Sequence, residues 1–368
     1  MNVNTMNLLF SLSRCVQESQ GRPERLRMSM CKAQQKGFSL IELMVAVTVG
    51  LFLLAGLSTV FVSSNRTRDE TARGIEQVEN GRYALQLLKN DLQVAGFLDA
   101  FDVANASLAV PSTKPNPCAT AVASLVAALP MHIQGYDNGT TLSCLSDVKA
   151  NTDIIVVRHT STCIAGSSNC SYVTSAPYFQ ASLFNSASEL SSASVSDQYR
   201  LDTVVTNLNR HQRDCSTLAN MRQYLTNIYF IANNDVVGDG IPTLKRAELG
   251  ANGFSIVPIA EGIENLQLEY GIDTTSDGIP DVFTANPDIY QSCAGAGCNT
   301  YWINTMSVKI NILAKSTSKS FGYTDSKTYT LGLDSTGNAN TVGPFSDSYK
   351  RHVYTTEVRM NNPAGRRQ

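Results

Sequence analysis

Three groups of residues could carry chemistry: an acid in an apolar stretch, two aspartate-rich loops, and a histidine near a cysteine. The acid is Glu42, close to the start of the run Gly37–Val62, which is otherwise almost free of charge. A carboxylate inside a membrane-spanning helix costs about 2.5–3.5 kcal/mol on insertion scales, so it is a functional candidate by default. A purely structural alternative stays open, in which Glu42 lies near the membrane surface and its carboxylate reaches water.

The aspartate-rich loops share the pattern D-x-x-x-D-G-I-P and begin at Asp235 and Asp273. In the second loop, Asp273, Asp277 and Asp281 partly match a calcium-binding loop, but Thr284 stands where the closing glutamate is expected. We favour the simpler interpretation, which is an Asp-Gly turn between strands. Apart from this weak calcium candidate, we expect no metal and no cofactor.

The third group is His211 and Cys215 in H-Q-R-D-C, a spacing that could place a base near a thiol. A loop cysteine in an exported protein is more often bridged or simply spare. The sequence contains no G-x-S-x-G, H-E-x-x-H or P-loop motif. We therefore predict that the protein is not an enzyme.

Nine cysteines occur in the 368 residues, two before the apolar stretch and seven after it. Short polar loops pinned by a cysteine at each end are typical of disulfides in an oxidising compartment, and no C-x-x-C pair favours zinc. Seven is odd, so one thiol, for which Cys215 is the candidate, is left over. The expected pairs are Cys163 with Cys170, Cys293 with Cys298, and Cys118 with Cys144.

The element that must position Glu42 is the apolar stretch itself. Residues 38–62 would span about 37 Å as a helix, enough to cross a bilayer core of about 30 Å. Apolar residues then recur at three- and four-residue steps, which predicts a helix over 38–95 with a transmembrane half at 38–62 and an amphipathic half at 63–96. That stripe comprises Ile75, Val78, Leu85, Leu88, Leu92 and Ala95, and Gly96 is the expected stop.

The segment before the helix is basic. Residues 1–36 contain six Lys or Arg and two Glu, and six minus two gives +4. A basic flank stays in the cytoplasm while the chain beyond the apolar stretch is exported, so we expect a leader over 1–37, a single inner-membrane span and a periplasmic head. Met28 or Met30 is an alternative start to Met1. The whole chain has a formal net charge of −2, which does not favour a nucleic-acid partner.

Beyond Gly96 the sequence alternates between strand-like runs and Gly/Asn/Asp/Ser loops. Period-2 runs joined by short loops predict an antiparallel sheet with one packed face, for which the amphipathic half-helix supplies a cover. The predicted fold class is therefore α+β, with a β-rich head over 97–368. The runs are 153–159, 223–232, 263–270, 306–312 and 353–360, while 111–130 and 181–198 are expected to be surface excursions.

The string K-G-F-S-L-I-E-L-M-V-A at Lys36–Ala46 resembles the class III signal of type IV pilins and type II secretion pseudopilins. The resemblance implies that a prepilin peptidase cuts after Gly37 and that Phe38 becomes an N-methylated first residue. It also implies that Glu42 pairs with the amino terminus of a neighbouring subunit. An acid that is expensive alone in the membrane and satisfied only on assembly can act as a register check.

Later strings are similar to those of PilW-type minor pilins, and the resemblance covers roughly 36–102 and 223–362. They are Tyr229–Arg246, Gly262–Asp273 and Tyr349–Asn362. The resemblance implies a pilin-like fold that moves from the inner membrane to a pilus on the cell surface, with other minor pilins and the major pilin as partners. The proline common in major pilin helices is absent, which favours a minor subunit. Two alternatives stay open: a type II secretion pseudopilin, and a pilus-tip adhesin that uses residues 103–222.

Overall fold

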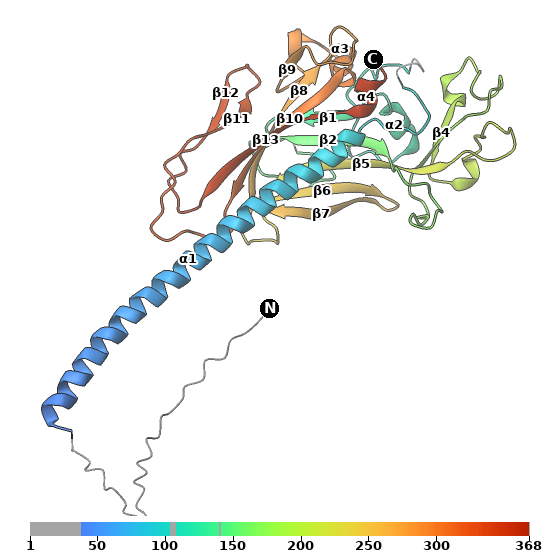
Figure 1. Ribbon diagram of the computed structural model, residues 1–368. Helices are drawn as coiled ribbons and strands as arrows, with labels where there is room; N and C mark the ends of the chain where they lie inside the picture. The colour runs from blue at the N-terminus through green and yellow to red at the C-terminus, as the bar shows by residue number, and fades with distance from the viewer. Residues whose placement is uncertain (1–37, 104–107, 140, 368) are drawn as a thin grey trace, which may run out of the picture. The chain divides into compact units, whose positions relative to one another are not determined.

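The computed structural model describes residues 38–103, 108–139 and 141–367, so the expected leader and Gly37 lie outside the described residues. The chain divides into two compact units, 1–62 and 63–368. Helix α1 comprises the 55 residues from Leu40 to Val94, which confirms the single long helix (Figure 1). Gly96 follows with a φ of 72°, a left-handed conformation that suits the residue after a helix.

The second unit is rich in strands. Its short helices are α2 (Val122–Ala127), α3 (Ala296–Ile303) and α4 (Asn361–Gly365), with 3-10 turns at 195–197, 205–207 and 290–292. Its strands are β1 (Ile133–Tyr136), β2 (Ile154–Thr160), β3 (Tyr178–Ala181), β4 (Tyr199–Asp202), β5 (Met221–Ala232), β6 (Thr243–Gly250), β7 (Gly253–Glu261), β8 (Ile263–Ile272), β9 (Val282–Thr284), β10 (Thr305–Lys315), β11 (Tyr329–Leu333), β12 (Ala339–Val342) and β13 (Arg351–Arg359).

These strands form three sheets in which every pair is antiparallel. The seven-stranded sheet has the order β1-β2-β5-β3-β4, with β6 on β5 and β7 on β6. The four-stranded sheet has the order β13-β10-β8-β9, and β11 pairs with β12 alone. The five predicted strands are β2, β5, β8, β10 and β13, and the predicted α+β class is confirmed.

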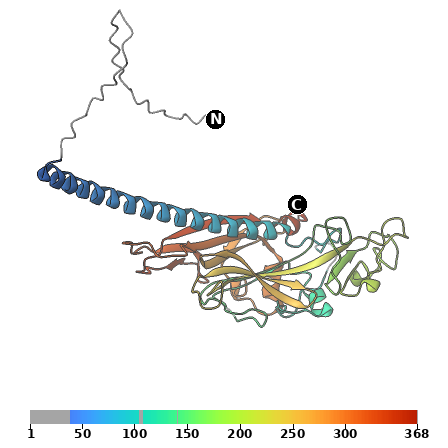
Figure 2. The same cartoon turned by 90° about the horizontal axis from the view of Figure 1, so that it is seen from below.

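One hydrophobic core joins the second half of α1 to both larger sheets. Ala84, Leu88 and Leu92 of the helix are fully buried and belong to the same cluster as residues from β2, β5, β8, β10 and β13. Figures 1 and 2 both show this half of the helix lying along the sheets. The helix therefore serves as the cover that the alternating strands require.

Strand β2 has apolar residues on both faces. Ile155 and Val157 belong to the cluster under α1, while Ile154 and Val156 belong to a cluster on the opposite side that includes Cys118 and Cys144. A strand buried on both faces has a continuous apolar sequence rather than an alternating one. This explains the run I-I-V-V at residues 154–157.

The prediction that 111–130 is a surface excursion is wrong. The segment contains α2, and Leu125 and Leu129 are buried in a cluster with strands β3 and β4. Pro111, Pro115 and Pro117 obscured it, because they interrupt every regular period before α2 begins at Val122. By contrast, 182–198 is irregular apart from the 3-10 turn at 195–197, and about half of its residues are exposed.

The predicted apolar stripe on α1 also needs correction at its start. Ile75 is exposed and Val78 only partly buried, and the buried positions there are Gln77 and Gly81. Gly81 is buried because the ring of Tyr354 on β13 lies where a Cβ atom would be. The helix thus approaches the sheet through small and polar residues before it reaches Leu88.

We predict that the two glycines Gly74 and Gly81 respond oppositely to alanine. A Cβ at Gly74 meets no atom within 4 Å, so Gly74→Ala should gain helix propensity and raise stability by about 1 kcal/mol. At Gly81 the new methyl overlaps the Tyr354 ring, and overpacking costs about 1–3 kcal/mol, so Gly81→Ala should be destabilising. Urea unfolding of the full chain in detergent checks both. Equal effects of the two substitutions would contradict the close approach.

Candidate functional site

The first described turn contains Phe38 and Glu42, the two residues of the expected processing and assembly signal that the structure describes. Phe38 is 85% exposed. The backbone N–H of Ser39 donates to Glu42 Oε2 at 3.0 Å, and the Ser39 hydroxyl accepts from the N–H of Ile41 at 3.3 Å. The Glu42 bond is one half of a capping box, S-x-x-E, which satisfies donors that a helix start leaves free. Glu42 therefore has a local structural role as well as the expected intersubunit role.

Beyond Glu42 the helix presents apolar side chains on every side. Within the described residues, α1 is the one helix long and apolar enough to span a membrane. Among the residues that the structure describes, nothing covers its apolar side chains from Leu40 to Val62, and Phe52 is one of the most exposed. A helix that is apolar all round is typical of burial in lipid or among other helices.

The head holds the other half of the helix through a buried carboxylate. Asp91, 12% exposed, accepts hydrogen bonds from His159 Nε2 at 2.8 Å, from the side-chain amide of Asn227 at 3.0 Å, and from the Tyr229 hydroxyl at 3.0 Å. Burial raises the pKa of Asp91, but these partners outweigh it and hold that pKa below its ordinary value. Burial likewise lowers the pKa of His159, and Asp91 more than offsets this, so the net shift is upward.

A second polar contact between α1 and the head lies about four helical turns before Asp91. The Gln77 side-chain amide donates to the carbonyls of Ala314 at 2.7 Å and Lys350 at 2.9 Å, joining the end of β10 to the start of β13. Neither Gln77 nor Asp91 was singled out from the sequence. The available signal was their spacing, because Gln77 lies four residues before Gly81, and Asp91 lies between Leu88 and Leu92 on the buried side.

The cysteines pair as the sequence suggests. The structure contains disulfides between Cys118 and Cys144, Cys163 and Cys170, and Cys293 and Cys298. Cys215 is free and exposed. The Cys118–Cys144 bridge packs on the outer face of β2 and β5 and joins two parts of the segment that covers this face.

The aspartate-rich loops use their carboxylates for turn formation. Asp273 accepts from the N–H groups of Ser276 and Gly278 and from Arg367. Asp281 accepts from Thr274 and Thr275. Across the described ranges, no group of three or more His, Cys, Asp or Glu is placed to hold a metal ion, and Asp277 does not join the other two aspartates. The guanidinium of Arg367 at Asp273 further disfavours a cation.

The structure does not bring His211 to Cys215. His211 Nδ1 lies 2.6 Å from Glu189 Oε1, and the Cys215 thiol donates to the Arg213 carbonyl at 3.6 Å. Glu189 also accepts from the Ser182 hydroxyl at 2.6 Å. These contacts fix the loop over residues 182–211 and assemble no nucleophile with a base.

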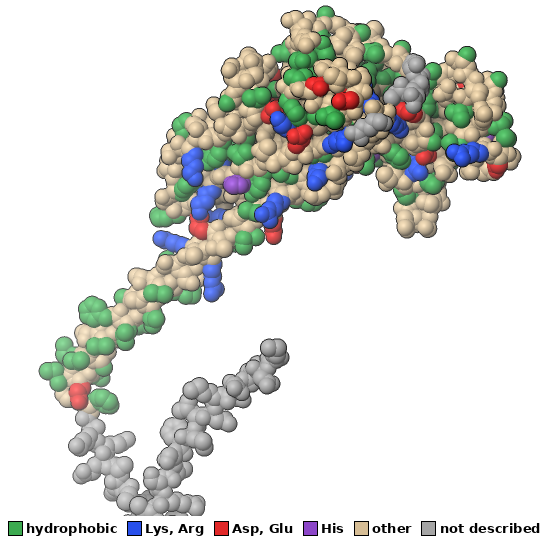
Figure 3. Space-filling model, turned by 45° about the horizontal axis from the view of Figure 1, so that its top comes forward, with side chains coloured by type: hydrophobic (Ala, Val, Ile, Leu, Met, Phe, Trp, Pro, Cys, Tyr) green, Lys and Arg blue, Asp and Glu red, His purple; other side chains and the backbone are tan. Residues whose placement is uncertain are grey.

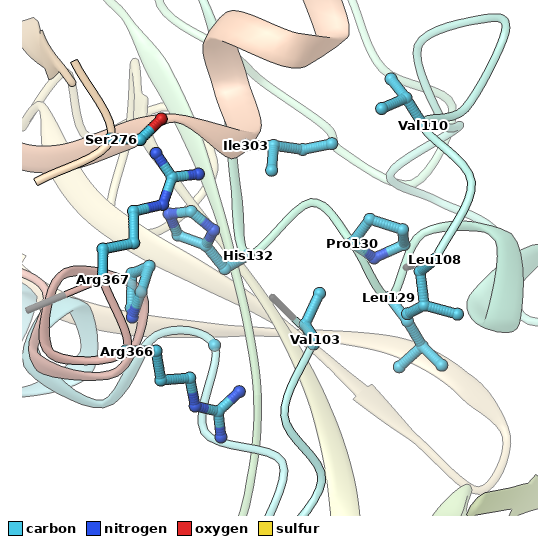
Figure 4. Close-up of a pocket in the computed structure, with 12 residues that line it drawn as sticks. Val103, Leu108, Val110, Leu129, Pro130, His132, Ser276, Ile303, Arg366 and Arg367 are labelled. Atoms are coloured by element: carbon cyan, nitrogen blue, oxygen red, sulfur yellow. The ribbon is translucent and has the colours of Figure 1, made fainter. Parts of the chain in front are cut away.

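A cavity of about 320 Å³ lies beside the C-terminal helix α4 (Figure 4). Its wall is mainly apolar, and its polar residues are already engaged. Arg367 pairs with Asp273 at 3.2 Å, Arg366 with Asp102 at 3.7 Å, and His132 Nε2 lies 2.9 Å from the Thr305 carbonyl. Burial lowers the pKa of His132 to about 4, so the ring is neutral at pH 7. The cavity offers shape but no free charge for a ligand.

Comparisons with known proteins match both ends of the chain. Residues 228–362 match the family described as Type IV Pilus-assembly protein W, and residues 32–58 match the prokaryotic N-terminal methylation motif. Among solved structures, a type IV-like pilin from Thermus thermophilus aligns with 66% of this chain and 94% of its own, at 12% identity and a TM-score of 0.26. So low a score supports no claim about fold. No curated protein sequence matches significantly.

The two family matches confirm the resemblance to PilW-type pilins and the presence of a prepilin-type signal. The pilus-assembly match, 228–362, lies within the predicted stretch 223–362. The methylation-motif match, 32–58, includes Gly37, Phe38 and Glu42. Residues 103–222 lie outside both matches, yet β1 to β4 belong to the same sheet as β5.

We predict that Asp91→Ala destabilises the head by about 3–5 kcal/mol, because it leaves three buried donors without their acceptor. Trp302, the single tryptophan, is buried and reports on unfolding by its fluorescence. The matched control is Glu79→Ala, at an exposed position of the same helix, which should change stability by less than about 0.5 kcal/mol. Similar small effects at both positions would show that the buried network is not important.

The Asp91–His159 pair should also make stability depend on pH. The Asp91 contribution is present above its unfolded-state pKa of 3.8 and is lost as the pH falls through the lower folded value. The His159 contribution is present below 6.5 and is lost as the pH rises through the higher folded value. The stability difference between wild type and Asp91→Ala should therefore peak between pH 3.8 and 6.5. Urea titrations at pH values below 3.8, within this range and above 6.5 measure it, and a difference that is the same in all three ranges would refute the pairing.

Proposed function

We propose that this PilW-like chain is a minor pilin that helps to assemble type IV pili. A prepilin peptidase removes residues 1–37, Phe38 becomes the methylated terminus, and residues 38–62 hold the protein in the inner membrane. The head over 97–368 then lies in the periplasm until the subunit enters a pilus. The observation that carries this proposal is the exposed apolar run headed by Phe38 and Glu42, within the matched methylation motif.

The geometry of Glu42 supports a role in assembly. One carboxylate oxygen, Oε2, accepts from Ser39, and within the described residues Oε1 has no hydrogen-bond partner. In lipid an incompletely satisfied carboxylate is costly, and the amino terminus of a neighbouring subunit would supply the missing positive charge. Assembly in the correct register then relieves a cost that the isolated subunit bears.

The proposed partners are prepilin peptidase, the other minor pilins and the major pilin. Contacts among pilins would use the apolar surface of 38–62, which has no cover within this chain. The match to a pilus-assembly family favours the pilus over a secretion pseudopilus. The engaged carboxylates of Asp273 and Asp281 make a calcium-dependent adhesin the weaker alternative.

We predict that Glu42→Gln and Glu42→Ala both reduce surface pili at least about tenfold, a factor that corresponds to about 1.4 kcal/mol. Glutamine can keep the hydrogen bond to Ser39 and removes only the charge, whereas alanine removes both. Counting pili by electron microscopy measures the effect, with membrane-fraction immunoblots to confirm equal protein levels.

Ser39→Ala is the matched control, because it removes the serine half of the helix cap and keeps the Glu42 charge. It should leave piliation nearly unchanged. Normal piliation in Glu42→Gln, together with loss of pili in Ser39→Ala, would assign Glu42 to helix capping and refute the assembly role.

Deletion of the gene should abolish twitching motility and spare enzyme secretion. The opposite pattern would assign the chain to a secretion machine.

A further inference from the structure

A segment of the head follows helix α1 turn by turn towards the end of its apolar run. Residues 314–321, which begin in the last two residues of β10, run antiparallel to α1. We call this stretch the clamp segment. Its contacts are Gln77 to the Ala314 carbonyl at 2.7 Å, the Thr317 hydroxyl to Glu76 at 3.1 Å, Arg73 to the Lys319 carbonyl at 2.9 Å, the Ser320 hydroxyl to Glu70 at 2.9 Å, and the Arg66 guanidinium over the Phe321 ring at 5.0 Å.

The chain that returns from the clamp segment to β13 is fixed as well. The buried guanidinium of Arg351 pairs with Glu264 at 2.5 Å, Asp325 at 2.9 Å and Asp347 at 2.7 Å. Lys350 pairs with Glu70 at 2.7 Å. The clamp segment and the start of β13 are thus both tied to the sheet or to the helix. The position of Phe321 beside Arg66 therefore follows from several independent contacts.

Phe321 is a large apolar side chain that the head leaves uncovered, at 87% exposure. Its neighbour Arg66 follows Val62, the last residue of the apolar run, by four residues, or about 6 Å along a helix. Aromatic rings, Trp and Tyr above all, collect at the boundary between the hydrocarbon core and the headgroups. If residues 38–62 span the bilayer, the chain connection alone keeps Arg66 within about 14 Å of the end of that span, and Phe321 contacts Arg66.

The surroundings of Phe321 are basic. Figure 3 shows Lys and Arg side chains on α1 just past the apolar side chains. Arg68 and Lys319 form no ion pair within the described ranges, and Arg66 contacts the Phe321 ring. The acids on this stretch of α1 are Asp69 and Glu70, and Glu70 pairs with Arg73 and Lys350. The cations Arg66, Arg68 and Lys319 then outnumber the remaining acid, Asp69. Guanidinium groups suit phosphate oxygens, which lie at this level of a bilayer.

We propose that Arg66, Arg68, Lys319 and Phe321 form a membrane-docking patch that binds the phospholipid headgroups around the helix. The inference rests on the proposed membrane anchoring of residues 38–62. Phe321 inserts at the headgroup boundary, and the cationic side chains contact lipid phosphates. The head is then held against the bilayer by a second contact besides its helix, and this contact has to break when the subunit leaves the membrane.

The test uses the full chain reconstituted into vesicles of phosphatidylethanolamine and phosphatidylglycerol, with brominated lipids as fluorescence quenchers. Phe321→Trp adds one tryptophan at the patch, and the wild type, with only buried Trp302, supplies the baseline. The added emission should be blue-shifted and mostly lost when bromine lies near the headgroups. Arg66→Gln combined with Arg68→Gln, or 1 M salt, which shortens the screening length to about 3 Å, should reduce that quenching.

The matched control is Leu218→Trp, at a half-exposed site just before β5. This part of β5 lies near the C-terminal end of α1, because Arg222 of β5 pairs with Asp99, five residues after that end. The C-terminal residue of α1, Val94, follows Val62 by 32 helical residues, or about 48 Å. Its emission should not be quenched. Equal quenching at the two positions would overturn the docking patch. Absence of quenching at Phe321→Trp, in protein that floats with the vesicles, would also overturn the docking patch but would leave the proposed anchoring of residues 38–62 intact.

Two other outcomes also overturn it. A blue shift at Phe321→Trp that needs added pilin subunits, and not lipid, would assign the patch to a subunit contact. Failure of the chain to float with vesicles would overturn the proposed anchoring as well, and flotation therefore separates the two failures.

Discussion

The carboxylate of Asp91 determines how the long helix sits on the head. It accepts hydrogen bonds from side chains of β2 and β5, so this turn of α1 can face the seven-stranded sheet in only one rotation. Because a helix repeats every 3.6 residues, fixing one turn fixes those next to it. Leu88 and Leu92 then point into the core, and Gly81 falls opposite Tyr354. A change at Asp91 would therefore disturb packing several turns away.

The two halves of α1 differ in side-chain burial although the helical backbone is continuous. Residues 40–62 present apolar side chains on all sides, and from residue 77 only one side is buried, yet α1 is continuous. No proline interrupts it. The apolar half and the half that packs on the sheets therefore belong to one helix, with no loop between them.

Much of the head could be predicted because its strands have strong local patterns. Strands β8, β10 and β13 alternate polar and apolar residues, since one face of their sheet lies under α1. Strands β6 and β7 could not be found this way. Pro258 interrupts β7, and a register shift between Leu244 and Lys245 breaks the alternation of β6. Asp91 was missed for a different reason, because its partners lie 68 to 138 residues away in the sequence.

The clamp segment has a mechanical consequence. Its hydrogen bonds join it to α1 at successive turns, at Gln77, Glu76, Arg73 and Glu70. A pull directed along the axis therefore loads these bonds in shear, so that they resist together, whereas a pull that peels the loop away breaks them one at a time. The clamp segment therefore resists sliding along α1 more strongly than it resists peeling away from it.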